Sequence, residues 1–491
     1  MKKSIVLILT GLFLFSTLFP ASGSIRKDDP SLNGLKKLVR QENTNIINSN
    51  YKGAKSEFTP SRNLTVVFDD VSLNGYGLVS GATRPIDGRD GKWVIAYRKG
   101  ADLFGNGSSG VLGVSTTNDI TSSDSWETVS DVNTLLGGIG AARYPNAAAS
   151  ADYPYAIWNE YTADVSSGSL YGGRGYYNYD QLGWGGNAWG TPVDVDLLWQ
   201  TGPKDHWVGS AQYSWSDDLN MGVMNVTYDD WTRFNHYLFH TEIIENGLAI
   251  FGEEILIFDT QNSASGDFQG DLGEDGYVTQ PSLSVNDNGQ GVVGVIGLFS
   301  GSDTESGTCS GLAAQLNACG HIPIFKLTDN HGATWYGDQA ANGHYFVPQS
   351  VFDDIFETKI SPNLGFGNTY TDCYGTNYSI IDFWSWYDWD IRIDSDGDIH
   401  IIMSYVPASS DFFHFDVEGA GFYHLTIDKD YINNPGSVNT PTGWNWSFLI
   451  NGGDTWRWDI DGNGSSQVFD THAQLSFAKD DPNVVWAVTN L

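Results

Sequence analysis

From residue 63 onward, the hydrophobic positions of the chain come in short runs rather than at helical spacing. Runs rich in Val, Ile, Tyr and Trp alternate with clusters of Gly, Asn and Asp. This is the pattern of short β-strands joined by tight turns. Residues 24–62 differ, because they are polar and basic, with one short helical pattern around residues 32–41. The body of the chain is therefore predicted to be all-β.

One pattern repeats six times in this body, namely a turn rich in Asp, Asn, Gly or Pro followed by a buried strand. The copies are GRDGKWVIAYRKG, SADYPYAIWNEYT, SDDLNMGVMNVTY, NDNGQGVVGVIGLF, DSDGDIHIIMSYV and KDDPNVVWAVTNL. Most copies are followed by a third strand, and many are preceded by a first strand. This order predicts a six-bladed β-propeller of four-stranded antiparallel blades, with an aromatic-rich insertion in the fifth unit. Two β-sandwich domains are the alternative, but they would not require the same order six times.

Closure of the ring is predicted from the two ends of the body. The sixth unit stops after its second strand at Leu491, so its outer strands are expected from the N-terminal stretch NLTVVFDDV, residues 63–71. The predicted organisation is a signal peptide at residues 1–23, a basic polar linker or pro-like arm at 24–62, and the propeller domain at 63–491.

The first residues determine the predicted location. Two lysines precede an apolar run, and the small residues Ala21, Ser22 and Gly23 follow it, which is the order of a cleaved secretory signal. The alternative, an uncleaved anchor, needs a longer run to cross a bilayer. We therefore expect a secreted or extracellular protein of bacterial type, with or without association with the cell surface. No membrane span is expected after cleavage.

Charge is distributed unevenly. The first 62 residues hold ten of the 25 basic residues and four of the 59 acidic ones, so residues 63–491 carry 15 basic against 55 acidic residues. A body this acidic repels nucleic acids and anionic membrane surfaces, which excludes both as partners. The same acidity suits binding of divalent cations.

Cysteine usage agrees with export. In an oxidising compartment, Cys309 and Cys319 of CSGLAAQLNAC can close a short loop, which would stabilise the fold by roughly 2–3 kcal/mol. Cys373 would then be left over. Three pairings exist in principle, and the local pair is the one we expect.

A hairpin in the fourth unit, KLTDNHGATWYGDQ, carries a family resemblance. Thr328, Asn330, Gly332, Thr334 and Trp335 match the Asp box (BNR repeat), with Asn where the family usually has Asp. A second copy, LINGGDTW, contains Asn451, Gly453, Thr455 and Trp456, and a degenerate third ends at Trp126. The chain thus resembles the sialidase-like β-propellers. In the box, a short polar side chain bonds backbone N–H groups of the turn and Gly supplies a positive φ, so the motif predicts a fold and no chemistry.

The resemblance implies a carboxylate-binding site made of arginines from the inner strands, with a Tyr–Glu nucleophile pair and an Asp acid/base. Arg84 in GATRPID and Arg143 in AARYPNA stand at equivalent first-strand positions, so they are candidates for ligand binding and catalysis. Arg392 or Arg457 would be the third member. The alternative is that Arg84 and Arg143 pair with acidic neighbours. Glu160 and Tyr161 are adjacent in a strand, where successive side chains point to opposite faces, so they are not expected to cooperate.

Further candidates lie at the entry of the third unit and in the fifth. Asp205 and His206 of KDHWVGS form a candidate proton-transfer pair, and Trp207 is a candidate stacking wall; an ordinary loop with a packed Trp is the alternative. Trp384 and Trp386 alternate within an aromatic-rich stretch and are candidates for binding a sugar or a partner protein. Core packing is the competing interpretation of these two residues.

Two Asp-rich turns have the alternating oxygen ligands of Ca²⁺ loops. The first contains Asp394, Asp396 and Asp398, and the second, DIDGNG, contains Asp459 and Asp461. Neither has the full 12-residue pattern with its terminal Glu, and the same residues make good β-turns. Ca²⁺ is thus the cofactor to test, at Asp394, Asp396 and Asp398 first.

Three functional hypotheses remain open from the sequence. The leading one is a secreted propeller that binds a glycan or an extracellular protein. The alternatives are a sialidase-like glycoside hydrolase that uses Arg84 and Arg143, and a structural module of a secreted assembly. A fold resemblance cannot choose among them, because propellers host unrelated functions. The sequence leaves the oligomeric state undetermined.

Overall fold

The computed structural model of the protein describes residues 24–26 and, with gaps, residues 83–488. The gaps are residues 102–109, 121, 135–139, 162–172, 197–205, 231–232, 234, 261–269, 274–279, 304–307, 386–388, 433–438, 452–457, 461–465, 469–472 and 479–480. Within the described part, the chain is mostly antiparallel β-structure, as predicted. No helix among these residues combines the length and hydrophobicity that a membrane crossing requires.

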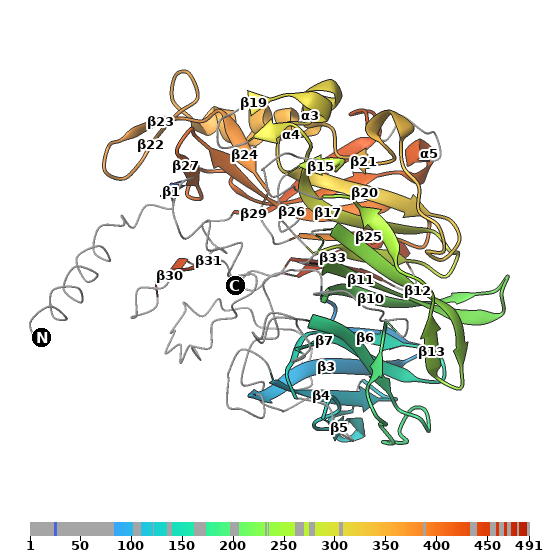
Figure 1. Ribbon diagram of the computed structural model, residues 1–491. Helices are drawn as coiled ribbons and strands as arrows, with labels where there is room; N and C mark the ends of the chain where they lie inside the picture. The colour runs from blue at the N-terminus through green and yellow to red at the C-terminus, as the bar shows by residue number, and fades with distance from the viewer. Residues whose placement is uncertain are drawn as a thin grey trace, which may run out of the picture.

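Four-stranded antiparallel units, here called blades, follow one another along the chain (Figure 1). The first contains β2 (Ile86–Arg89), β3 (Lys92–Ala101), β4 (Gly110–Thr117) and β5 (Glu127–Val129). The second contains β6 (Ala142–Ala149), β7 (Pro154–Tyr161), β8 (Gly173–Tyr179) and β9 (Val193–Asp194). The third contains β10 (His206–Ser216), β11 (Met221–Asp230), β12 (Asn235–Glu245) and β14 (Ile255–Phe258), with β13 (Leu248–Phe251) on the outer part of β12.

The next two blades continue this order. The fourth contains β16 (Ser282–Val285), β17 (Gly291–Phe299), β20 (Ile322–Thr328) and β21 (Tyr345–Phe346), and β15 (Leu272–Gly273) also pairs with β17. The fifth contains β25 (Trp389–Ile393), β26 (Ile399–Ala408), β28 (Gly421–Ile427) and β29 (Trp444–Asn451). The far half of β26 pairs with β24 (Asp382–Trp384) and β27 (Phe412–His414). A hairpin of β32 (Gln474–Ala478) and β33 (Asp481–Val488) comes last.

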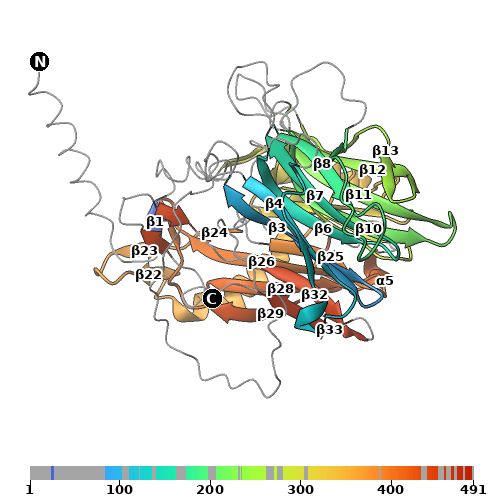
Figure 2. The ribbon, with the colours of Figure 1, turned by 90° about the horizontal axis from the view of Figure 1, so that it is seen from below.

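The first strands of successive blades lie side by side, in the order β2, β6, β10, β16, β25 and β32. The segment before β2 also meets the end of this series, because Arg84 hydrogen-bonds Asp390 of β25 and Gln474 Nε2 donates to Thr83 O (2.7 Å). Figure 2 shows β32 and β33 beside β28 and β29 of the fifth blade. This convergence of inner strands is propeller-like, as the repeats predict.

The number of blades stays a prediction. The described part of the sixth unit is the β32–β33 hairpin, and the strand expected at residues 63–71 to complete it lies outside the described residues. Strand β1 (Ser24–Arg26), next to the predicted cleavage site, pairs with β27 of the fifth blade. Strands β30 (Trp458–Ile460) and β31 (Ser466–Val468) form a separate hairpin.

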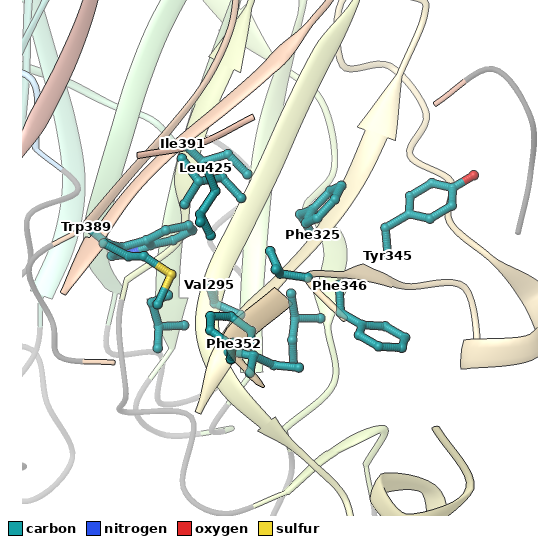
Figure 3. Close-up of a cluster of buried hydrophobic side chains, with 14 of the residues drawn as sticks. Val295, Phe325, Tyr345, Phe346, Phe352, Trp389, Ile391 and Leu425 are labelled. Carbon is teal, nitrogen blue, oxygen red and sulfur yellow. The ribbon is translucent and has the colours of Figure 1, made fainter. Parts of the chain in front are cut away.

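Stacking of the blades buries both faces of the middle strands. All nine residues of β17 and all ten of β26 are buried, which explains why their sequences are almost continuously apolar rather than alternating. The largest hydrophobic cluster joins the fourth and fifth blades, and Figure 3 shows Val295, Phe325 and Trp389 within it. Burial at this scale provides most of the folding free energy.

Insertions carry most of the helical structure. The helices are α3 (Gly311–Leu316), α4 (Gln349–Ile355) and α5 (Lys429–Ile432), with a π-turn at Phe356–Ile360 and 3₁₀ turns at Ser123–Ser125, Gln339–Ala341 and Ser361–Asn363. Short strand pairs are β18 (Ser302–Asp303) with β19 (Thr308–Cys309), and β22 (Thr369–Thr371) with β23 (Asn377–Ser379). The β22–β23 hairpin projects from the body at the upper left of Figure 1. It belongs to the predicted aromatic-rich insertion of the fifth unit.

Candidate functional site

Arg84 lies at the centre of the inner strands, and its side chain is engaged by protein groups. It is 5% exposed. Its Nη2 donates to Asp390 Oδ1 (2.9 Å), Ser282 Oγ (3.2 Å) and Ile391 O (3.2 Å), and its Nη1 lies 3.5 Å from Gln212 Oε1. Burial lowers the pKa of Arg84 to about 10, so it remains charged at neutral pH. Pairing with an acidic residue is thus the geometry found for Arg84.

Arg143 lies in β6 beside a backbone irregularity. Its residue is 4% exposed and faces Asn159 of β7. The register shifts between Arg143 and Asn146, where buried Tyr144 has a φ of 51°, a conformation that few non-glycine residues adopt. Arg143 therefore lies in a first strand, as predicted, whereas Arg84 lies just before one, and both residues are buried. A role for Arg143 in ligand binding stays a prediction.

The residues proposed at the entry of the third blade are largely core. Trp207 is fully buried and its ring lies 5.4 Å from that of Tyr144. His206 is also buried, 4.2 Å from the ring of Tyr228. Asp205 lies outside the described residues, so the proposed His–Asp pair stays a prediction.

The carboxylate of Glu160 is held by groups of the chain around it. It accepts hydrogen bonds from Ala141 N (2.6 Å), Trp158 Nε1 (2.7 Å) and Asn133 Nδ2 (3.2 Å). Burial, which outweighs these hydrogen bonds, raises its pKa to about 7. The contacts join β6 and β7 to the segment before them.

Of the two aromatic candidates in the fifth unit, Trp384 is among the residues that the structure describes. Trp384 in β24 is partly buried, with its ring 3.6 Å from that of His321 and 5.0 Å from that of Phe413. Trp386 lies outside the described residues. Core packing is therefore the observed environment of Trp384.

The Asp394–Asp398 stretch forms a tight turn. Asp394 Oδ1 accepts from the backbone N–H groups of Asp396, Gly397 and Asp398 at 2.8–2.9 Å. Burial would raise the pKa of Asp394, but its hydrogen bonds and His400 lower it instead. Among the described residues, no group of three or more His, Cys, Asp or Glu side chains is arranged to hold a metal. Calcium binding by Asp394, Asp396 and Asp398 stays a prediction, and Asp459 and Asp461 have no described side-chain environment.

The structure contains the expected disulfide between Cys309 and Cys319, and Cys373 is free and exposed. The bridge ties β19 to the end of the loop after α3.

The Asp-box-like hairpin has the predicted turn chemistry. Gly332 N donates to Thr328 Oγ1 (3.1 Å) and Thr334 N to Asn330 Oδ1 (3.0 Å), and Gly332 has a φ of 93°. A side chain at Gly332 would meet Asn225 Oδ1 of the third blade at 2.4 Å. Trp335 packs against the main hydrophobic cluster. The hairpin therefore docks the fourth blade onto the third, and the rest of the second box, after Asn451, lies outside the described residues.

A pocket of about 460 Å³ opens where the six first strands end. We call it the axial pocket, because β2, β6, β10, β16, β25 and β32, or the turns that follow them, all contribute to it. Its lining includes charged, amide, hydroxyl and aromatic side chains: Asp87, Arg89, Gln212, Tyr213, Ser284, Asn286, Asp287, Asn288, Arg392, Asp394, Ser395, Ser476 and Phe477. Polar side chains predominate in this lining, so the pocket offers many hydrogen-bond donors and acceptors beside the aromatic surfaces of Tyr213 and Phe477.

Arg392 is a charged group of the axial pocket whose guanidinium is bound by protein at one nitrogen. Its Nε donates to Asp390 Oδ2 (3.0 Å), and its side chain is 20% exposed. Among the described residues, no other hydrogen bond to its guanidinium is found. Asp390 is buried and also accepts from Arg84, Ser282 Oγ (3.1 Å) and Leu475 N (3.0 Å). Asp390 therefore fixes the position of Arg392 while leaving the outer nitrogens of its guanidinium available.

The other charges of the axial pocket are paired or shielded. Arg89 Nη2 lies 2.6 Å from Asp287 Oδ1, and its guanidinium lies 5.2 Å from the centre of the Tyr213 ring. Asp87 accepts from Ala149 N (2.8 Å), but burial outweighs this bond and the nearby arginines and raises its pKa. Burial also raises the pKa of Tyr213 to about 12. The phenol is therefore neutral at physiological pH.

Sequence reasoning named Arg392 as a candidate but missed Asp87, Arg89 and Asp390. The sequence did carry a signal, because two first strands each place an acidic and a basic side chain at alternate positions. These pairs are Asp87 and Arg89 in RPIDGR, and Asp390 and Arg392 in DWDIRID. Alternate residues point to one face of a strand, so each pair shares the face toward the axis.

A search with the sequence finds no matching family model and no similar curated protein. Comparison of the fold finds partial similarity to glycoside hydrolases. An exo-1,5-α-L-arabinanase from a bovine ruminal metagenomic library is 11% identical, with a TM-score of 0.33, over 71% of this chain and 94% of that chain. An α-L-arabinofuranosidase from Lactobacillus brevis is 10% identical, with a TM-score of 0.32, over 72% and 93%. The NanB sialidase from Streptococcus pneumoniae is 11% identical, with a TM-score of 0.30, over 65% of this chain and 36% of that chain. Similarity at this level leaves the function to be inferred from this chain's own residues.

Proposed function

We propose that this protein is an extracellular saccharide-binding protein whose axial pocket takes a sugar that carries a carboxylate. The observation that carries the proposal is Arg392, held by Asp390 at one nitrogen and facing a pocket of about 460 Å³. A guanidinium fork matches the two oxygens of a carboxylate and binds them in a fixed orientation. Arg392 thus takes the role that the family resemblance implies for an inner-strand arginine.

The rest of the axial pocket suits a sugar ring. Gln212, Asn286 and Ser476 offer amide and hydroxyl groups to sugar hydroxyls, and Tyr213 and Phe477 offer aromatic surface. Arg84 is not the proposed anchor, because it is buried and both terminal nitrogens of its guanidinium already contact protein acceptors. The Cys309–Cys319 disulfide supports an oxidising, extracellular location.

The experiment is titration calorimetry of residues 24–491 with glucuronate, galacturonate and N-acetylneuraminate, and with glucose and galactose as neutral counterparts. We expect an acidic sugar to bind and its neutral counterpart to bind much more weakly. Arg392→Ala should weaken binding of the acidic sugar at least about tenfold, which corresponds to 1.4 kcal/mol. Lys359→Ala makes the same change in net charge outside the axial pocket and should leave binding unchanged.

Equal binding of acidic and neutral sugars, or undiminished binding by Arg392→Ala, would refute the proposed role of Arg392. Absence of binding by the whole panel would refute the saccharide-binding proposal for the axial pocket.

One observation favours a second function, glycoside hydrolysis in the same pocket. Asp87 is a pocket carboxyl whose pKa is raised by burial, and an acid with a raised pKa can protonate a leaving group. Turnover of fluorogenic glycosides, sialosides included, should then occur and be lost in Asp87→Asn. Binding without turnover would leave the saccharide-binding function and reject the hydrolase.

A further inference from the structure

A second polar groove lies in the insertion of the fifth unit, and it shares no lining residue with the axial pocket. It measures about 580 Å³ and is lined by the β22–β23 hairpin, by the turn before it and by residues 416–418. We call it the insertion groove. Its lining side chains are Asn363, Phe366, Thr369, Tyr370, Thr371, Asn377, Asp416, Val417 and Glu418.

Phe366 is held fully exposed at the rim of this groove. A closed turn presents it, because Gly365 N donates to Thr369 O (2.7 Å), Thr369 N donates to Gly365 O (3.2 Å), and Thr369 Oγ1 donates to Phe366 O (2.8 Å). Water contact over a whole Phe side chain is unfavourable by about 1.5–3 kcal/mol relative to burial. The turn therefore presents an aromatic face at the rim of a polar groove, where a ligand ring can stack on it.

The floor and the opposite wall are ordered and polar. The Tyr370 ring stacks on that of Tyr378, with centroids 6.3 Å apart, and its hydroxyl donates to Asp416 Oδ2. Thr371 Oγ1 donates to Asn377 Oδ1 (2.7 Å), so the hairpin presents a hydroxyl and an amide in register. Asn363 Nδ2 donates to Lys359 O (2.8 Å) and lies 3.3 Å from Glu418 O. These contacts fix one wall against the other.

Charge determines the class of ligand. The lining includes the carboxylates Asp416 and Glu418 and no Lys or Arg. Acidic ligands are therefore repelled. Hydroxyl groups can donate to the two carboxylates and to the oxygens of Thr371 and Asn377, while an apolar ring face can stack on Phe366.

We propose that the insertion groove binds an uncharged oligosaccharide, with Phe366 as the stacking platform and Asp416, Glu418, Thr371 and Asn377 as acceptors of sugar hydroxyls. This site is independent of the axial pocket and of the acidic sugar proposed there. A basic peptide is the competing ligand, since cations also bind aromatic faces and carboxylates. The uncharged side chains Asn363, Thr369, Thr371 and Asn377 outnumber the two carboxylates, and this favours the sugar.

The experiment measures binding of cello-, xylo-, manno- and maltohexaose to residues 24–491 by calorimetry, with an oligolysine peptide as the competing arm. At least one neutral hexasaccharide should bind, and Phe366→Ala should weaken it about tenfold or more. Phe366→Trp should retain binding, because it keeps an aromatic face. Tyr374→Ala is the matched control, since it removes an exposed aromatic side chain of the adjacent β22–β23 hairpin that does not line the groove.

The outcomes separate the two sites. Arg392→Ala should leave hexasaccharide binding unchanged, and Phe366→Ala should leave acidic-sugar binding at the axial pocket unchanged. The proposal is overturned if no hexasaccharide binds, if Phe366→Ala and Tyr374→Ala behave alike, or if oligolysine alone binds in a Phe366-dependent manner. Circular dichroism of Phe366→Ala should match that of the unmodified chain, because the side chain contacts solvent rather than the core.

Discussion

The axial pocket and the insertion groove are both lined by polar side chains, but they differ in what those side chains already contact. Next to the axial pocket, buried Asp390 accepts four hydrogen bonds and holds two arginines, of which Arg392 lines the pocket. In the insertion groove, Glu418 has no side-chain partner among the described residues, and Phe366 is fully exposed. The axial charges therefore stabilise the fold as well as facing a ligand, whereas the groove can change with little effect on folding.

Asp390→Ala is the substitution expected to lower the free energy of unfolding most. The substitution leaves Arg84 buried without its carboxylate, and loss of one partner of a buried ion pair costs about 3–5 kcal/mol. Urea unfolding monitored by Trp fluorescence should show the loss. The double variant Arg84→Met/Asp390→Leu removes both charges and should recover part of the loss, because Leu475 N and Arg392 Nε still lack their acceptor. An unfolding midpoint that does not change in Asp390→Ala would contradict the structural role of this pair.

Arg392→Ala should have a smaller effect on stability and a larger one on binding. Asp390 keeps Arg84, Ser282 and Leu475 as donors, so the expected cost is about 1.5–3 kcal/mol, the range for one charged hydrogen bond. The same urea titration measures it beside Asp390→Ala. A cost equal to that of Asp390→Ala would mean that Arg392, and not Arg84, is the main partner of Asp390.

Much of the fold follows from the sequence, because turn formation by Asp and Gly and strand formation by apolar runs depend on residues that are close together in the chain. The turn at Asp394 and the positive φ of Gly332 are examples, since each depends on residues within five positions. The axial site was harder to predict. Arg84 and Asp390 meet across 306 residues, and no local pattern distinguishes a paired arginine such as Arg84 from a partly free one such as Arg392.

The insertion groove shows the same limit. The aromatic density of residues 370–389 predicts stacking surface, yet Trp384 is packed against His321 and Phe413. The exposed ring belongs to Phe366, just before that stretch. Exposure depends on the turn closed by Gly365 and Thr369, which composition does not reveal.

The pH dependence of stability should separate two axial carboxyls whose pKa values shift in opposite directions, buried Asp390 and half-buried Asp87. Burial would raise the pKa of Asp390, but Arg392 and Arg84 outweigh burial and lower it. The stabilisation that ionised Asp390 provides is therefore present above the unfolded-state pKa and is lost as the pH falls below about 4. Burial raises the pKa of Asp87, so its contribution is present below the unfolded pKa and is lost as pH rises through the folded pKa. Between pH 4 and 8, the unfolding free energy of Asp87→Asn should therefore increase relative to that of the unmodified chain as the pH rises. A pH-independent difference would contradict the raised pKa of Asp87.

The smallest expected effect is that of Asp416→Ala, the counterpart of Asp390→Ala in the insertion groove. Asp416 accepts from the Tyr370 hydroxyl at the surface, and water can replace either partner when the other is removed. The expected cost is below about 1 kcal/mol, as for other exposed polar contacts, and the urea midpoint should shift little. The proposed hexasaccharide should bind more weakly to this variant, because one acceptor is lost. A cost near that of Asp390→Ala would show that the groove is also a structural element, and its polar lining would then need no ligand to explain it.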